Sequence, residues 1–267
     1  MQDNSGLQLL EGPSLAYEYL AMHTQEEPGG PLAKKEARQA VAHAIDYNGI
    51  IDGLVGGRAV RPATVVPLGL LGTDEVEPSA NQTDVAKANE LWKASGNGPA
   101  ELTLTYGAGQ FCPGGLSRDV LSAKLQQDIQ QIEGVTVKLN PMDPTQRLQQ
   151  YREGKLQFTM SDWSPDYADV HTYADPFGRT GGAAAKRVGY SNPEVDKLLG
   201  EGIAELDVAA RTEDYVQIQK ILLDDSAFIV EFQPNYVVPA SATVTDTAPH
   251  GVYIIQLRYT TKEGAAS

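Results

Sequence analysis

Cysteine is nearly absent from this sequence, which has one, Cys112, among 267 residues. A single cysteine cannot form an internal disulfide, and it excludes a zinc site built on several cysteine ligands. Neither Cys112 nor His171, the histidine considered as its base, carries the local signature of a catalytic pair, so we interpret the thiol as a small apolar group. Scarce cysteine suits both a reducing cytosol and a bacterial envelope, so composition leaves the compartment open.

Basic residues are also scarce, because 21 Lys and Arg oppose 35 Asp and Glu and give a formal net charge of −14. This balance repels phosphate groups, so we expect neither nucleic acid nor an anionic membrane as a partner. The sequence lacks an apolar run of about 18 residues, and no segment is therefore expected to insert into a membrane. The polar start, Met1 to Gly6, lacks the basic and apolar regions of a signal peptide.

Helix and strand patterns alternate along the chain without a repeat or an evident linker, which predicts one α/β domain over residues 1–267. The clearest unit is a strand at 101–106, a glycine-rich loop at 107–115, a helix at 121–132 and a strand at 135–139. This order is typical of a parallel crossover. We also expect strands at 15–22, 156–160, 227–232 and 252–257. Further helices are expected at 37–45, 50–55, 85–92, 145–153 and 209–223, and another is expected to begin at Pro193. The remaining expectations are an irregular segment at 58–82, a polar loop through Pro176 and a frayed end at 264–267.

An acidic and aromatic segment follows the apolar run at 156–160, at the point where that strand is expected to end. It includes Trp163, Asp166 and Tyr167, and further acidic or titratable residues nearby are Asp162, Asp169, His171 and Asp175. Ligands of open α/β sheets bind outside the carboxyl ends of the strands. We therefore expect this segment and the 107–115 loop to lie on one rim of the sheet.

Three kinds of site could use this acidic cluster. It could bind a hard cation, although the spacing is not that of a calcium loop and the glycine of such a turn is missing. It could be a solvated loop that caps the next helix. It could anchor a ligand ammonium group, which the neighbouring aromatic residues favour. Because the 107–115 loop lacks the ending of a P-loop and the four histidines lack metal spacing, we expect no metal and no cofactor.

Four blocks of the sequence together resemble the C-terminal lobe of the dipeptide- and oligopeptide-binding proteins of ABC transporters, solute-binding protein family 5. The blocks are Pro31–Asp46 with its Arg-Gln-Ala and Ala-Ile-Asp signatures, the Gly57-Arg58-Ala59 turn leading to Val66–Gly69, Trp163–Tyr167, and Gly189–Asp196. Their order and spacing match the family over about residues 15 to 240. The agreement of four blocks in register is more specific than any one of them.

The resemblance implies an α/β fold of the class II periplasmic-binding-protein type, a lobe with a mixed, mostly parallel sheet flanked by helices. Intact members are longer, begin with a secretion signal and close two lobes over the ligand, so this chain is expected to be the second lobe. The resemblance also implies a monomer, periplasmic or held outside the cytoplasmic membrane by a lipid anchor. Its partners would be a peptide or other small solute and ABC permease subunits, and it would have no catalytic residues.

The same resemblance assigns Asp166 to the α-amino group of a bound peptide and Trp163 to the wall of the pocket. Met160 and Ser161 stand where some members carry basic residues for the carboxylate of the peptide. The sequence Ala168-Asp169-Val170 also differs from the more usual Pro-Asp-Pro. The ligand-binding residues expected from these comparisons and from the predicted rim are Asp166, Trp163, Ser164, Pro165, Tyr167, Gln110 and Phe111.

Other functions stay open at this point. The solute could be an oligosaccharide, an opine or a nickel complex, since the wider family carries these. A hydrolase of the glycosidase type would use Asp166 and Asp169 as paired carboxylates facing each other across a cleft. A scaffold that docks on a transporter without touching solute is a third alternative.

Overall fold

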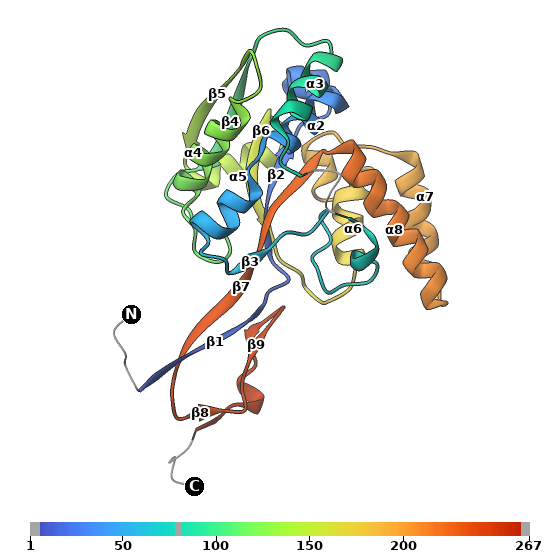
Figure 1. Ribbon diagram of the computed structural model, residues 1–267. Coiled ribbons are helices and arrows are strands. Elements are labelled where there is room, and N and C mark those ends of the chain that lie inside the picture. The colour runs from blue at the N-terminus through green and yellow to red at the C-terminus, as the bar shows by residue number, and fades with distance from the viewer. Residues whose placement is uncertain (1–5, 78–81, 263–267) are drawn as a thin grey trace.

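The computed structural model describes residues 6–77 and 82–262 and is built on one seven-stranded sheet. The strands lie in the order β1-β7-β2-β6-β4-β5, with β3 paired to β7 (Figure 1). Their bounds are β1 Leu7–Pro13, β2 Tyr17–Met22, β3 Ala59–Val60, β4 Ala100–Gly107, β5 Val135–Met142, β6 Phe158–Trp163 and β7 Phe228–Ser241. The segment before Gly6, Pro78 of the irregular segment and the end at 264–267 lie outside the described residues.

The strands of this sheet run in two opposite directions. Strand β4 pairs in parallel with β5 and with β6, which confirms the crossover expected between 101 and 139. Strand β2 pairs antiparallel with β6 and with β7, so β7 runs in the same direction as β4, β5 and β6. Strands β1 and β3 pair antiparallel with β7. The α/β class with a mixed sheet is confirmed, and four of the seven strands share one direction.

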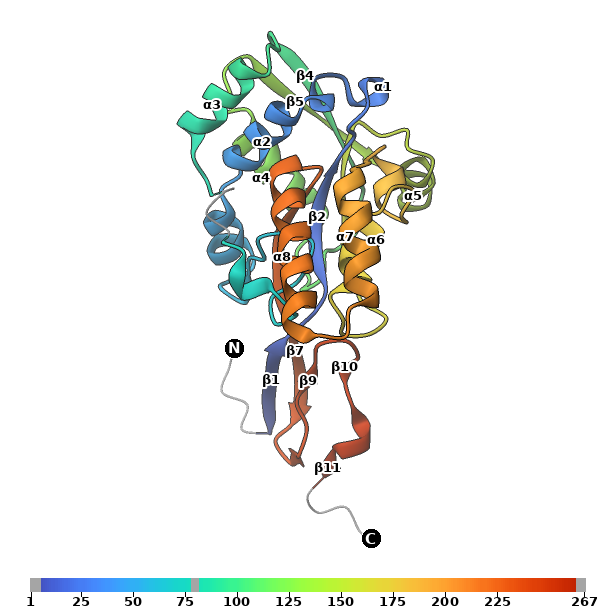
Figure 2. The ribbon, with the colours of Figure 1, turned by 90° about the vertical axis from the view of Figure 1, so that its right-hand side faces the viewer.

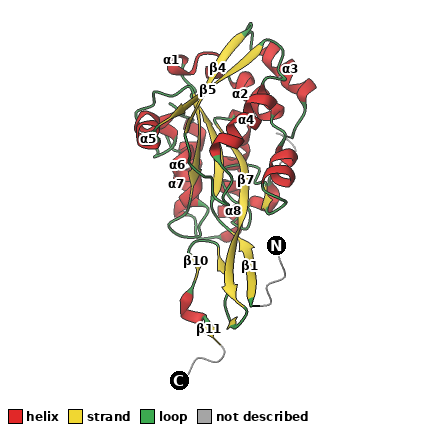
Figure 3. Cartoon of the chain, turned by 90° about the vertical axis from the view of Figure 1, so that its left-hand side faces the viewer, coloured by secondary structure: helices red, strands yellow, loops and turns green. Residues whose placement is uncertain are grey.

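Helices cover both faces of the sheet (Figure 3). Successive side chains of a strand point to opposite faces, and β2 is buried along its whole length. Leu20 and Met22 therefore join one hydrophobic cluster with α2, α3 and α4, while Tyr17 and Tyr19 join a second cluster with α6, α7 and α8. The bounds are α1 Glu26–Gly29, η1 Gly30–Ala33, α2 Lys35–Ala44, η2 Gly49–Leu54, η3 Thr73–Glu75, α3 Val85–Ala94, α4 Arg118–Ile129, α5 Pro144–Arg152, α6 His171–Gly178, η5 Ala185–Arg187, α7 Pro193–Ala204 and α8 Val208–Asp225. Within the described ranges, these helices are too short or too polar to span a bilayer.

Most expected elements are present, and the capping residues explain where several helices begin. The Asn192 side chain accepts hydrogen bonds from the backbone N–H groups of Glu194 at 3.1 Å and Val195 at 3.5 Å at the start of α7. Asp84 caps α3 in the same way, through the N–H of Lys87 at 2.9 Å. These side chains satisfy backbone donors that have no partner inside the helix.

Two expected elements were wrong. The polar loop through Pro176 is the helix α6, because Tyr173 and Phe177, one turn apart, are both fully buried and this burial outweighs the hydrogen bond lost at the proline. The strand expected at 252–257 is reduced to the pair Ile254–Ile255, because Tyr253 and Leu257 are exposed and have no core to pack against. Strand β1 was not expected, and β7 extends to Ser241 rather than to 232.

Strand β1 and the distal half of β7 leave the helical body as a two-stranded ribbon (Figure 2). The ribbon also carries short C-terminal elements: β8 Val244–Thr245, β9 Pro249–His250, β10 Ile254–Ile255, η6 Leu257–Tyr259 and β11 Thr261–Lys262. Both ends of the described chain lie at this ribbon (Figure 1). Several of its large apolar side chains are exposed to solvent: Leu7, Leu9, Tyr253, Ile254 and Leu257.

Candidate ligand-binding site

The carboxyl ends of β4, β5 and β6 form one rim of the sheet. Gly107 at the end of β4 pairs with Met142 at the end of β5, and β6 ends at Trp163. The 108–117 loop and the 164–170 loop therefore leave the sheet at the same edge, as the sequence predicted. Tyr17, which starts β2 just after the ribbon strand β1, pairs with Trp163, so this rim borders the base of the ribbon.

A buried guanidinium group connects several elements at this rim through hydrogen bonds. Arg118, the first residue of α4, is 2% exposed, and it donates to both carboxylate oxygens of Glu18, from Nε at 2.8 Å and from Nη2 at 2.9 Å. Its Nη2 also donates to Asp162 at 2.5 Å, and its Nη1 donates to Gln110 at 2.8 Å. A cation at a helix N-terminus is disfavoured by the helix dipole, and the two carboxylates offset this cost. Arg118 thus joins β2, β6 and the 108–117 loop.

A second buried carboxyl group, that of Glu231, lies near Glu18 and Arg118. Glu18 and Glu231 are both fully buried, and neither oxygen of Glu231 accepts a hydrogen bond from any described residue. Burial raises the pKa of Glu18 to about 7 against the opposing effect of Arg118. Burial, and then the charge of Glu18, raises the pKa of Glu231 well above its usual value. We therefore infer that Glu231 is the neutral acid and Glu18 the carboxylate paired with Arg118.

The acidic residues at the end of β6 and in the segment after it differ in their partners. Three of them are paired with arginines: Asp162 with Arg118 at 2.5 Å, Asp169 with Arg211 at 2.9 Å, and Asp175 with Arg179. Asp166 is exposed, and its carboxylate makes no hydrogen bond or ion pair with any residue that the structure describes. Of the acidic residues in this segment, Asp166 is thus the one left available to a cation from outside.

Asp169, one member of the hypothetical glycosidase pair, is already bound to an arginine. A general acid needs a raised pKa. Burial alone would raise the pKa of Asp169, but hydrogen bonds from Arg211 and from the backbone N–H of His171 hold it below its usual value. Among the described residues, no group of three His, Cys, Asp or Glu side chains is arranged to hold a metal ion.

The structure places the expected ligand-binding residues on one rim, but in different environments. Trp163 is partly buried and packs edge to face on Phe177, with ring centroids 5.0 Å apart. Gln110 accepts a hydrogen bond from Arg118, as described above. In the 163–167 segment Pro165 is buried while Ser164, Asp166 and Tyr167 are exposed, and across the rim Phe111 is 68% exposed. Trp163 therefore serves partly as a core residue, and Asp166, Tyr167 and Phe111 offer the free surface.

The interpretation of Cys112 as an apolar core residue is confirmed. The thiol is buried in the cluster on the α4 face of the sheet, and burial raises its pKa well above the usual value. His171 lies toward the other cluster, where its Nδ1 is 2.8 Å from the hydroxyl of Tyr215. The sheet separates the two side chains, so they do not form a nucleophile and base.

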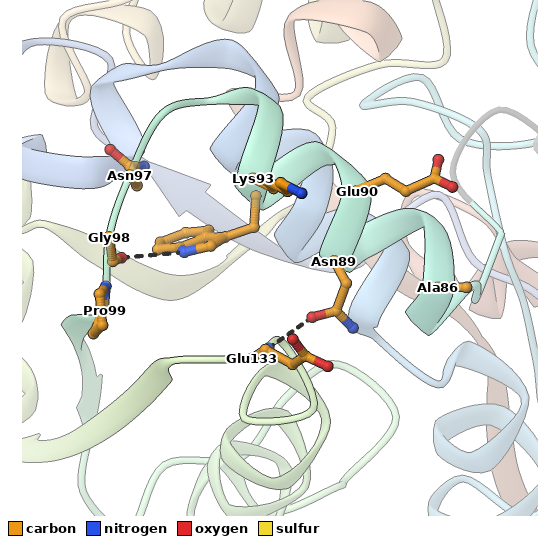
Figure 4. A pocket seen from close by; sticks show the side chains of 9 residues that line it. Ala86, Asn89, Glu90, Lys93, Asn97, Gly98, Pro99 and Glu133 are labelled. Atoms are coloured by element: carbon orange, nitrogen blue, oxygen red, sulfur yellow. Dashed lines mark hydrogen bonds between the residues drawn. The ribbon is translucent and has the colours of Figure 1, made fainter.

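A separate hollow of about 400 Å³ lies at the opposite edge of the sheet (Figure 4). It is lined by α3, by the turn that leads into β4 and by Glu133 before β5, hence at the amino ends of the parallel strands. Two of its polar groups already have partners: Trp92 Nε1 donates to the carbonyl of Gly98 at 3.3 Å, and the N–H of Glu133 donates to Asn89 at 2.7 Å. We interpret it as a surface groove rather than a ligand site.

Solved structures share this fold. The chain superposes with a TM-score of 0.84 on CtaP, an ABC transporter substrate-binding protein from Listeria monocytogenes, over 96% of this chain and 52% of that one at 24% identity. It superposes with a TM-score of 0.81 on a dipeptide-binding protein from Pseudoalteromonas sp. SM9913 in complex with Met-Leu, over 98% and 51% of the two chains at 20% identity. The fold is therefore that of a periplasmic-binding-protein lobe.

Sequence comparison identifies the family. The model of the bacterial extracellular solute-binding proteins, family 5 (middle region), matches residues 1–185, and the chain belongs to this family. It is 28% identical over 238 residues to the "Probable D,D-dipeptide-binding periplasmic protein DdpA" of Escherichia coli K12, covering 88% of this chain and 44% of that protein. It is 25% identical over 242 residues to the dipeptide-binding protein DppE of Bacillus subtilis 168, covering 87% and 43%. The chain thus spans less than half the length of these relatives.

Proposed function

We propose that this chain is one lobe of a solute-binding protein that captures peptides for an ABC importer. The observation that carries the proposal is the free carboxylate of Asp166 on the carboxyl rim, beside the exposed ring of Tyr167. A peptide α-ammonium group pairs well with such a carboxylate, and an aromatic ring suits its side chain. Membership of the family and the dipeptide-binding relatives support the same solute class.

The partner of this rim would be a second lobe attached through the β1–β7 ribbon. The ribbon exposes Leu7 and Leu9 on one strand and Tyr253 and Leu257 in its C-terminal elements, an apolar surface that a second lobe would cover. The relatives are more than twice as long as their matched regions, which supports a two-lobe parent of which residues 1–267 form one. Closure about the ribbon would enclose the solute.

The setting of the protein follows from the same proposal. The relative from E. coli is named as periplasmic, and we propose an extracytoplasmic location for this protein too, with the ABC permease as its partner. We propose that it binds without catalysis and acts as a monomer. Three of the relatives that the sequence matches are named as binding proteins, which supports the absence of catalysis.

The isolated chain is expected to bind a peptide only weakly. Half of the contacts and the whole of lobe closure would be missing, so adding about 1 mM Ala-Ala should raise its melting temperature by less than about 1 °C. Differential scanning fluorimetry with and without the dipeptide measures this shift. A shift of several degrees would show that the lobe binds by itself and that the second lobe is not required.

Replacing Asp166 with Asn in the full-length two-lobe protein is expected to weaken Ala-Ala binding by about 10- to 150-fold, since a charge-assisted contact contributes about 1.5–3 kcal/mol. Isothermal titration calorimetry measures the dissociation constant. The matched control is Asp52→Asn, which removes an exposed carboxylate on η2 and should leave affinity unchanged.

A second ligand makes this test specific for the ammonium group. N-acetyl-Ala-Ala lacks the positive charge, so it should bind the unaltered protein weakly and lose nothing more with Asp166→Asn. Equal affinity of the altered and unaltered proteins for Ala-Ala would rule out the anchor. Tight binding of an oligosaccharide, an opine or a nickel complex, with no binding of peptides, would move the proposal to another solute class.

A further inference from the structure

The loop that carries Asp166, residues 164–170, is fastened at both ends. At its start Trp163 packs on Phe177 of α6, with ring centroids 5.0 Å apart. At its end Asp169 is bound by Arg211 of α8, which is distant in the sequence and adjacent in space. Between these points Asp166 and Tyr167 are exposed. The loop is therefore held on both sides of Asp166, whose carboxylate is free.

The guanidinium group of Arg211 contacts both carboxylate oxygens of Asp169. Nη2 of Arg211 donates to both carboxylate oxygens of Asp169, at 2.9 and 3.2 Å. Nε of Arg211 donates to the carbonyl of Gly202 in α7 at 3.1 Å, and the guanidinium lies 5.0 Å from the ring centroid of Tyr215. Arg211 is thus itself held by α7 and α8, which lie side by side (Figure 2).

Asp169 in turn fixes the backbone on both of its sides. One carboxylate oxygen accepts from the N–H of His171 at 2.8 Å, which joins the loop to the first turn of α6. The N–H of Asp169 donates to the carbonyl of Tyr167 at 3.1 Å, and the hydroxyl of Thr172 donates to the same carbonyl at 3.3 Å. The peptide group that follows Tyr167 is therefore held, one residue after Asp166.

We propose that Arg211 is a positioning residue for solute capture, which it serves by clamping Asp169 and so setting the place of Asp166. This inference rests on the proposed function, because it assumes that Asp166 meets the solute. A loop held in its binding geometry loses less conformational freedom when the solute arrives. Arg211 does not have to touch the solute to affect its affinity.

Tryptophan fluorescence can test the clamp in the chain alone. The sequence has two tryptophans, Trp92 and Trp163, so Trp92→Phe leaves Trp163 as the single reporter at the start of the loop. In this background Arg211→Gln should increase acrylamide quenching of Trp163, because the released loop exposes the indole. The matched control is Arg179→Gln, which removes an arginine paired with Asp175 of α6 rather than with the loop.

Affinity gives the second measurement. In the full-length protein, Arg211→Gln should weaken Ala-Ala binding by about tenfold, and Asp169→Asn should have a similar effect. The double variant should be no weaker than either single one, since all three remove the ion pair between Asp169 and Arg211. Arg179→Gln should bind like the unaltered protein.

The outcomes separate the clamp from the proposed function. Quenching of Trp163 that does not change with either Arg211→Gln or Asp169→Asn overturns the clamp, whatever the solute is. Increased quenching with unchanged affinity for Ala-Ala overturns its positioning role. If Asp166→Asn leaves affinity unchanged while Arg211→Gln lowers it, the clamp stands and the anchor assignment fails.

Discussion

Glu231→Gln is expected to stabilise the protein at pH 7, although it replaces a fully buried residue. The Glu231 carboxyl has a raised pKa because of burial first and of the nearby Glu18 charge second. Folding at neutral pH therefore requires this group to bind a proton that the unfolded chain does not hold. Glutamine has nearly the same shape and needs no proton. Urea unfolding of both proteins measures the difference.

The pH dependence of this gain has a definite sign. A group whose pKa is raised on folding stabilises the folded state fully below its unfolded pKa, which is 4.5 for glutamate here, and this stability is lost as the pH rises through the folded value. The advantage of Glu231→Gln should therefore vanish near pH 4.5 and grow from there to pH 7.

The control for this substitution is Glu101→Gln, which removes an exposed carboxylate on β4 and should change stability by less than about 0.5 kcal/mol. Proton uptake offers an independent check, because refolding of the unaltered protein near pH 7 should take up more protons than refolding of Glu231→Gln. If Glu231→Gln proves destabilising by 1 kcal/mol or more at pH 7, the carboxyl group is ionised and well paired, and the inferred charge state is wrong.

The parts of the fold that could be predicted from the sequence are those specified by local signals. The crossover from 100 to 142 follows from two alternating strands around one helical stripe, and α7 begins at a side-chain cap followed by Pro193. Helix α6 escaped prediction because Pro176 and the polar residues around it outweighed the pair Tyr173 and Phe177. That pair, spaced by one helical turn and fully buried, was the usable signal.

At the ribbon, one strand that was expected is nearly absent, and one strand that was not expected is present. The apolar run at 252–257 has the composition of a strand, but only Ile254–Ile255 pair, with β9. Strand β1 alternates between exposed and half-buried residues and pairs with the distal part of β7, more than 200 residues away. Pairing over that separation depends on where the rest of the sheet puts β7, and no local pattern reports it.

Of the candidate site, only the residues that are contiguous in the sequence could be predicted to lie together. Asp166 and its neighbours are contiguous in sequence, so their joint presence on the rim follows from the end of β6. Arg118 was missed because it lies 100 residues from Glu18 and 44 from Asp162, and Arg211 was missed because it lies 42 residues from Asp169. The start of α4 held one usable signal: an arginine at the positive end of a helix is unfavourable unless acidic groups lie close by.

Arg118→Met is expected to destabilise the protein by about 3–5 kcal/mol at pH 8, since it leaves one partner of a buried ion pair without its counter-ion. Methionine fills much of the volume of the arginine stem, so the loss reports charge rather than a cavity. Glu18, fully buried, would lose both of its charge-assisted hydrogen bonds, and Asp162 and Gln110 would each lose one. Urea unfolding monitored by circular dichroism measures the change.

Acidification should relieve much of this loss. The pKa of Glu18, already raised by burial to about 7, would rise further without Arg118, so the carboxyl becomes neutral in the folded variant. Titration of Glu18 in the unfolded chain is common to both proteins, so the stability penalty is largest at high pH and shrinks as the pH falls through about 7, the folded-state pKa of Glu18 in the unaltered protein. If Arg118→Met does not fold at pH 8, its unfolding at pH 5 still provides the measurement.

A double variant separates charge from packing. Glu18→Gln combined with Arg118→Met removes both members of the pair and should recover more than half of the stability lost by Arg118→Met alone, because no buried charge is then unpaired. Arg152→Met, at an exposed position in the last turn of α5, is the control and should be near neutral. A double variant as unstable as Arg118→Met at pH 8 would mean that packing of the arginine stem, rather than compensation of Glu18, holds the 108–117 loop on the rim.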